Sequence, residues 1–124
     1  MTSVLIDSSG WIEYFTEGAH TDRFFHHLKD PRRIVTPVIV LYEVYKKMKR
    51  ERSEQEALEA VAQMLKTQVV PLSEDLALSA ADVSLEYGLP MADAIVYATA
   101  LEYGCKVLTL DSDFSKLPNA EVLR

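Results

Sequence analysis

The sequence predicts an α/β fold with a mainly parallel central sheet flanked by helices. Short apolar runs typical of buried strands alternate along the 124 residues with longer stretches whose apolar residues recur at helical spacing. This alternation favours parallel strands joined by helices. Because no repeat, low-complexity tract or Gly/Ser linker interrupts the chain, we expect one domain over residues 1–124.

The N-terminal part predicts a strand, two helices and a second strand. The apolar run Ser3 to Ile6 ends at Asp7, and the small hydroxyl residues that follow open a helix rich in aromatic residues. Asp22 to Leu28 is expected to form the next helix, which Pro31 ends. The run Arg33 to Val35 then has the composition of a second strand.

The segment Val38 to Tyr45 fits both strand and helix. Its β-branched and aromatic residues favour a strand, whereas its length favours a buried helix. The flanking residues favour the helix, because Thr36 suits the N-cap, Pro37 suits the first turn, and lysines close the run. We therefore predict a helix.

The next stretch predicts a capped helix and a short strand. Ser53-Glu54-Gln55-Glu56 has the form of a capping box, and apolar residues repeat behind it at helical spacing up to Leu65. Val69-Val70 then predicts a strand.

Two helices and two strands are expected in the remaining chain. Ser73 should cap a helix that ends at Gly88, and a second helix should run from Met91 to Gly104. The apolar run Lys106 to Leu110 predicts a strand, and Val122-Leu123 predicts a last short one.

The formal charge of −6 argues against nucleic acid as a partner, but the basic residues are concentrated in one region. Nine of the thirteen Lys and Arg residues lie between Arg23 and Arg52, and five of them form a run: Lys46, Lys47, Lys49, Arg50 and Arg52. One interpretation is a solvated helix end, where cations favour the dipole. The other is a basic rim beside an acidic centre, which phosphodiester chemistry requires.

The chain is expected to be cytosolic and to stay outside membranes. Its first apolar run is too short for a signal-peptide core, and no stretch approaches the length of a membrane span. The single cysteine, Cys105, cannot form an internal disulfide and is expected to be a small core residue.

Two aspartates stand where ligands bind in parallel α/β sheets, outside the carboxyl ends of the strands, and a third could converge with them. Asp7 and Asp111 each end a predicted strand, and Asp93 lies in the first turn of its helix. Each has an ordinary alternative: Asp7 could cap the next helix, Asp93 could complement the helix dipole, and Asp111 could form an Asx turn.

Glu43 stands inside the apolar run of the ambiguous segment. An ionised carboxylate buried there would cost several kcal/mol unless it were paired or bound to a metal. The alternative is a helix residue that faces solvent, since a helix usually has one wet face.

Convergence of these four carboxylates would define a metal site. Four like charges within a few ångströms would repel one another, so a divalent cation or protonation must relieve them. Oxygen ligands without His or Cys favour Mg²⁺ or Mn²⁺, ions that serve phosphate chemistry. One of Ser8 and Ser9 would orient Asp7 or a water in the site. The pattern thus points to phosphodiester hydrolysis.

Four segments of the chain resemble the motifs of the PIN-domain nucleases and, within them, the VapC-type toxins of prokaryotic toxin-antitoxin modules. The segments are Val4 to Ser9, Thr36 to Val44, Leu89 to Ala100 and Leu108 to Phe114. Each is a weak signal alone, but their order and spacing cover almost the whole chain.

The resemblance implies a single-strand-directed endoribonuclease that uses Mg²⁺ or Mn²⁺. It also implies a homodimer held inactive by a small antitoxin that inserts into the site. By this resemblance, Asp7, Glu43 and Asp93 are metal ligands, and so is Asp111, whose role Asp113 could share or replace. The basic residues Lys46, Lys47, Lys49 and Arg50 are then candidate contacts to RNA or to the antitoxin.

Two other functional classes fit less well. A non-catalytic PIN-like module that binds RNA or protein would keep the fold, but here every acidic position is filled. A receiver-type phosphorylation domain needs an acidic pair after the first strand and a lysine after a late strand. This chain has a single aspartate before Ser8 and has Asp111 where that lysine is needed.

Overall fold

The computed structural model describes residues 3–123, and their strands form one all-parallel sheet. The strands are β1 (Val4–Ile6), β2 (Ile34–Pro37), β3 (Gln68–Val70), β4 (Lys106–Thr109) and β5 (Ala120–Val122). Their order across the sheet is β3-β2-β1-β4-β5, and every neighbouring pair is parallel. The predicted α/β fold with a parallel central sheet is therefore confirmed.

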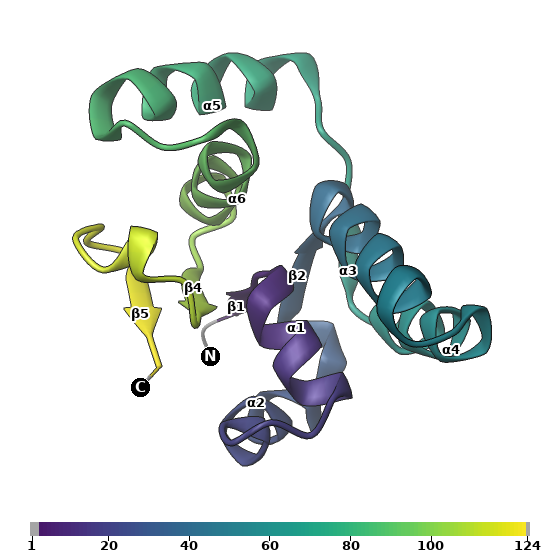
Figure 1. Cartoon of the computed structure of the whole chain (residues 1–124). Coiled ribbons are helices and arrows are strands. Elements are labelled where there is room, and N and C mark those ends of the chain that lie inside the picture. The colour runs from purple at the N-terminus through teal and green to yellow at the C-terminus, as the bar shows by residue number, and fades with distance from the viewer. Residues whose placement is uncertain (1–2, 124) are drawn as a thin grey trace.

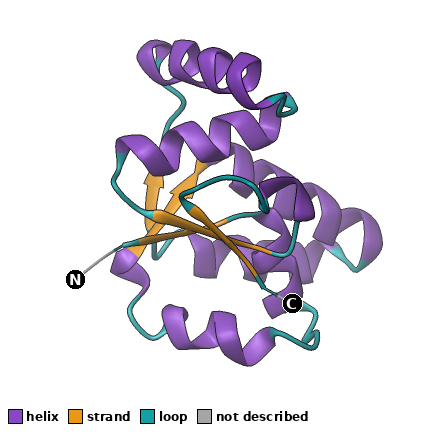
Figure 2. Cartoon of the chain, turned by 90° about the vertical axis from the view of Figure 1, so that its left-hand side faces the viewer, coloured by secondary structure: helices purple, strands orange, loops and turns teal. Residues whose placement is uncertain are grey.

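Helices cover both sides of this sheet (Figures 1 and 2). The α-helices are α1 (Ser8–Phe15), α2 (Thr21–Leu28), α3 (Val38–Glu51), α4 (Glu54–Met64), α5 (Glu74–Tyr87) and α6 (Met91–Glu102), and two 3₁₀ turns are η1 (Pro31–Arg33) and η2 (Ser112–Phe114). Helices α1 and α2 lie on the side opposite to α5 and α6, while α3 packs against both α1 and α4. No helix in residues 3–123 is long and apolar enough to cross a membrane.

Helix α6 lies between α5 and the sheet, and this position explains its composition. Seven successive residues, Ala94 to Ala100, are buried, so the helix has apolar residues on all sides. It contacts α5 on one side and β2 and β4 on the other. The N-terminal turn of α6 lies at the carboxyl edge of the sheet, where Asp93 approaches Asp111.

Three predicted helix signals are found in the structure. Ser53 accepts a hydrogen bond from the Glu56 amide at 3.0 Å, and Ser73 accepts one from the Leu76 amide at 3.1 Å. Gly88 ends α5 in the left-handed conformation, with φ of 69°. The expected core position of Cys105 is also confirmed, since only 2% of it is exposed.

The predicted roles of Thr36 and Pro37 are wrong. Both belong to β2, and the helix begins only at Val38. Buried Thr36 pairs its hydroxyl with that of Thr67 at 2.6 Å instead of capping α3. Pro37 is accepted because it is the last residue of the strand, where a missing N–H does least harm to the sheet.

Candidate active site

The parallel sheet brings distant acidic residues to one edge. Asp7 follows β1 directly, and Asp111 follows the neighbouring strand β4 by two residues. The Asp7 amide continues the pairing of these strands by donating to the Leu108 carbonyl at 3.3 Å. Asp93 lies in the first turn of α6, and Glu43 lies on α3. The four predicted carboxylates thus come from four different elements.

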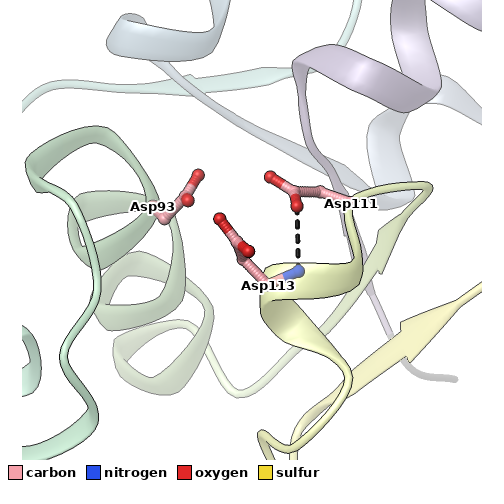
Figure 3. Close-up of side chains that lie close together, drawn as sticks. All are labelled: Asp93, Asp111 and Asp113. Atoms are coloured by element: carbon pink, nitrogen blue, oxygen red, sulfur yellow. Dashed lines mark hydrogen bonds between the residues drawn. The ribbon is translucent and has the colours of Figure 1, made fainter.

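Asp93, Asp111 and Asp113 converge in this structure (Figure 3). Each offers one carboxylate oxygen, and these oxygens lie within 4.8 Å of one another. Asp111 accepts a hydrogen bond from the Asp113 amide at 2.9 Å, which starts η2 and turns Asp113 toward Asp93. The Asx turn suggested for Asp111 therefore exists, and it helps to build the cluster.

Asp7 lies behind this cluster and is only 5% exposed. Its Oδ1 accepts from the Ser9 hydroxyl at 2.7 Å and from the Gly10 amide at 3.1 Å. Its Oδ2 accepts from the Thr109 hydroxyl at 2.6 Å. The bond from Gly10 makes Asp7 the N-cap of α1, so the capping interpretation is also correct.

Thr109 is a site residue that sequence reasoning missed. It is fully buried at the end of β4, and its hydroxyl accepts from the Asp111 amide at 2.9 Å while donating to Asp7. Ser9 works in parallel, because its hydroxyl accepts from the Leu110 amide at 3.0 Å. The available signal was a threonine inside an apolar strand, two residues before the acidic position.

Glu43 is neither fully buried nor fully solvated. Its side chain faces the N-terminus of α1, where a hydrogen bond with Ser8 lowers its pKa. Partial burial outweighs that bond, and with the nearby charge of Asp7 it raises the pKa of Glu43 above its ordinary value. Ser8 thus supports Glu43, while Ser9 supports Asp7.

The pKa shifts show that five carboxylates form one electrostatic group. Burial, followed by the charges of Asp111, Asp113, Asp7 and Glu43, raises the pKa of Asp93 to about 6. Burial also raises the pKa of Asp7, against the lowering effect of its three hydrogen bonds. The charges of the other four carboxylates therefore destabilise the ionised form of Asp93, and a bound cation would relieve this repulsion.

The donor set fits a hard divalent cation. Asp93, Asp111 and Asp113 supply only carboxylate oxygens at a spacing that one ion can bridge, with Asp7 adjacent. Oxygen ligands of this kind suit Mg²⁺ or Mn²⁺ rather than metals that prefer His or Cys. The residues present are therefore consistent with a metal site.

A groove of about 450 Å³ adjoins the acidic group. It is lined by residues of α1 and α3: Ser8, Ser9, Ile12, Glu13, Tyr42, Glu43, Lys46, Lys47 and Arg50. Lys49, the fourth predicted contact, is not part of this lining. Its Nζ lies 3.1 Å from a Glu54 oxygen and 3.3 Å from the Tyr45 hydroxyl.

The chain is therefore an α/β protein whose parallel sheet has a cluster of carboxylates at its carboxyl edge. Such an acidic site is suited to divalent cations. The family model for the PIN domain matches residues 4–120, and the chain belongs to the PIN-domain family. No curated protein matches the chain.

Several solved structures share the fold over nearly the whole chain. A toxin–antitoxin complex from Klebsiella pneumoniae has a TM-score of 0.82 at 24% identity and covers 97% of both chains. VapC20 from Mycobacterium tuberculosis, a toxin that cleaves the sarcin-ricin loop, has a TM-score of 0.79 at 22% identity, covering 97% of this chain and 98% of that one. DNA-bound VapBC from Salmonella typhimurium has a TM-score of 0.78 at 16% identity, covering 99% and 98%.

Proposed function

We propose that this chain is a metal-dependent endoribonuclease, the toxin of a VapBC-type pair. The observation that carries the proposal is the set of five carboxylates gathered at the carboxyl edge of a PIN-domain sheet. The similar fold of a toxin that cleaves the sarcin-ricin loop supports RNA as the substrate.

Asp93, Asp111 and Asp113 would hold Mg²⁺ or Mn²⁺, with Asp7 and Glu43 completing the metal-binding group. When bound, the cation supplies Lewis acidity that offsets charge developing on the phosphodiester in the transition state. The catalytic group is Asp7, Glu43, Asp93 and Asp111. Thr109 and Ser9 keep the buried Asp7 carboxylate oriented, and Ser8 does the same for Glu43.

Partners form the second part of the proposal. The solved toxin–antitoxin and VapBC structures of this fold support a small antitoxin partner. Exposed apolar side chains on α5, among them Leu78 and Leu85, support a homodimer. Lys46, Lys47 and Arg50 are placed to contact RNA or the antitoxin in the groove. The free, buried Cys105 agrees with action in the cytoplasm.

Cleavage of RNA by the purified protein in Mn²⁺ tests the enzyme proposal. Asp7→Asn and Asp93→Asn should each abolish cleavage while the circular dichroism spectrum stays unchanged. Asp82→Asn is the matched control, because Asp82 is an exposed acidic residue on α5 outside the carboxylate group. Undiminished cleavage by both site variants would refute the proposal.

Calorimetry with Mn²⁺ separates the enzyme from the non-catalytic PIN-like module that binds RNA or protein. The enzyme should bind Mn²⁺, and Asp93→Asn should weaken the binding at least tenfold because one ligand is lost. Absence of any heat of Mn²⁺ binding would favour the module.

A further inference from the structure

We propose that Tyr42 stacks on a nucleobase of single-stranded RNA and so positions the strand beside the carboxylate group. The inference rests on the proposed ribonuclease function and deepens it. It assigns a substrate-binding role to a residue outside the acidic motifs.

Tyr42 lies in the groove at the point where the groove meets the site. It precedes Glu43 on α3, and the opposite wall holds Ser8 and Ser9, which hydrogen-bond Glu43 and Asp7 respectively. A strand that follows this groove therefore reaches Glu43 and the two serines that support the carboxylate group. A base held by Tyr42 would be next to the reacting phosphate.

The Tyr42 side chain is available for stacking. The residue is 60% exposed, compared with 40% for Tyr87 and 39% for Tyr103. Within residues 3–123 its ring does not pack against another aromatic ring, whereas the rings of Tyr14 and Tyr87 do. Stacking is favourable with any nucleobase, because every base has a π face.

The cations in the same groove fit an anionic strand. Lys46, Lys47 and Arg50 line it one to two helical turns beyond Tyr42, in a chain whose net charge is −6. An aromatic side chain beside a row of cations is the usual arrangement for single-stranded nucleic acid, in which bases stack and phosphates pair with Lys and Arg. In a duplex the bases are already stacked on one another, so Tyr42 would have no free face to contact.

A second tyrosine–lysine pair on α3 distinguishes a structural role of Tyr42 from a role in RNA binding. The Lys46 Nζ lies 5.5 Å from the Tyr42 ring centroid and 3.4 Å from its hydroxyl, an i,i+4 pair that stabilises a helix. Tyr45 and Lys49 repeat this pair on the same helix at 5.4 Å and 3.3 Å, but neither lines the groove. Loss of helix stability should therefore be similar for Tyr42 and Tyr45, while loss of RNA binding should be specific to Tyr42.

Fluorescence anisotropy in EDTA tests the proposal without requiring cleavage. The probes are a labelled oligo(A), an abasic oligoribonucleotide of equal length, and a blunt RNA duplex. Tyr42→Leu should weaken oligo(A) binding about fivefold or more and leave the abasic and duplex affinities unchanged. Tyr42→Phe should bind oligo(A) as the parent does, because the ring is retained. Tyr45→Leu should also bind as the parent does.

Lys47→Gln separates base contacts from phosphate contacts. It should weaken oligo(A) and the abasic oligomer alike, because both carry the same phosphates. Equal weakening of oligo(A) and the abasic oligomer by Tyr42→Leu would overturn the stacking role. If Tyr42→Leu bound oligo(A) as tightly as the parent protein, the stacking role would also be overturned. The groove would then be better explained as a contact site for a protein partner.

Kinetics with Mn²⁺ provide a second measurement. Tyr42→Leu should raise KM for a single-stranded substrate about fivefold or more with a smaller change in kcat. Failure of the ribonuclease proposal would appear as no cleavage by the parent protein, while the EDTA measurements would still report on Tyr42. The two proposals therefore fail in distinguishable ways.

Discussion

At the scale of single residues, the two oxygens of Asp7 have different partners. Oδ1 accepts from Ser9 and from the Gly10 amide, so it fixes the start of α1, whereas Oδ2 accepts from Thr109 on β4. Burial of a carboxylate is costly unless it is hydrogen-bonded, and these three bonds offset part of that cost. Asp7 therefore joins two elements and remains oriented toward the other carboxylates.

Thr109→Val tests the contribution of this support. Valine has a similar shape but removes the donor to Asp7 and the acceptor for the Asp111 amide. We expect the free energy of unfolding to fall by about 1.5–3 kcal/mol, as for a hydrogen bond to a charged group. Since the Thr109 bond lowers the pKa of Asp7, the acid limb of the activity–pH profile should move to higher pH.

Denaturant unfolding and a pH series of cleavage rates measure these two effects. Thr109→Ser is the matched control, because it keeps the hydroxyl and should preserve the pH profile. An unchanged profile in Thr109→Val would show that the hydroxyl does not control the ionisation of Asp7.

Asp93 should make the stability of the metal-free protein depend on pH. The pKa of Asp93 is raised to about 6 in the folded chain, against an ordinary value of 3.8. Between these values the folded state binds more protons than the unfolded state, so this group lowers stability as pH rises through the window. Its unfavourable contribution is complete above about pH 6 and absent well below pH 4.

Asp93→Asn should therefore raise Tm in EDTA at pH 7.5 and change it much less at pH 4.5. Thermal denaturation followed by circular dichroism is sufficient to measure this. Saturating Mn²⁺ should reverse the order at pH 7.5, because the parent then gains stability from a ligand that the variant binds poorly. A Tm difference in EDTA that does not vary with pH would contradict the raised pKa.

At the scale of elements, the sequence is sufficient to predict where a helix begins or ends when the local signal has only one physical meaning. Ser53, Ser73 and Gly88 mark helix ends through their own backbone chemistry, and all three predictions are confirmed. Thr36 and Pro37 were assigned wrongly because a helix start and a strand end accept the same residues. The deciding partner, Thr67, is 31 residues away in the chain, so no local pattern contains it.

The same distinction applies to the site. Asp7 and Asp111 could be predicted to lie together because parallel strands end at one edge, whereas Asp93 was expected from the first turn of its helix. Thr109 was missed because its role depends on the register of β1 with β4. The grouping of Asp113 with Asp93 depends on the turn at η2. The sequence therefore left open whether Asp111 or Asp113 has the larger role at the site.

Gly10 shows how closely α1 approaches its neighbours. A Cβ at this position would lie 2.6 Å from Cε1 of Phe24 and 2.7 Å from Cγ2 of Ile6, much closer than atoms pack. Helix propensity alone predicts that Gly10→Ala stabilises the protein by about 0.5–1 kcal/mol. Overpacking predicts the opposite sign, a loss of about 1–3 kcal/mol.

We expect the loss, measured as a lower urea midpoint with an unchanged m-value. Gly10→Ala in a Phe24→Leu background should cost less, because the smaller side chain leaves room for the added methyl group. A higher midpoint for Gly10→Ala in the parent chain would show that α1 moves freely enough to accept the side chain.

At the scale of the whole molecule, charge is separated rather than balanced. Five carboxylates meet at the sheet edge, and three cations line the adjoining groove of a chain with net charge −6. An RNA strand would therefore be repelled by the excess negative charge of the chain and attracted to the cations of the groove. A cation held by the carboxylates, together with the groove, would draw an anionic substrate to the region where its backbone meets the carboxylates.

This distribution predicts a modest salt dependence of RNA binding. Release of counterions from single-stranded nucleic acid gives a slope of about −0.7 per neutralised phosphate in a plot of log affinity against log salt. Contacts from Lys46, Lys47 and Arg50 should thus give a slope near about −2 for oligo(A) in EDTA.

Lys47→Gln should make that slope shallower by about 0.7, because one phosphate contact is lost. Lys66→Gln should leave it unchanged, because Lys66 is an exposed cation outside the groove. Tyr42→Leu should lower affinity at every salt concentration without changing the slope, since stacking releases no counterion. A slope that stays the same in Lys47→Gln would mean that RNA binds elsewhere on the surface, and the groove would then have no part in substrate binding.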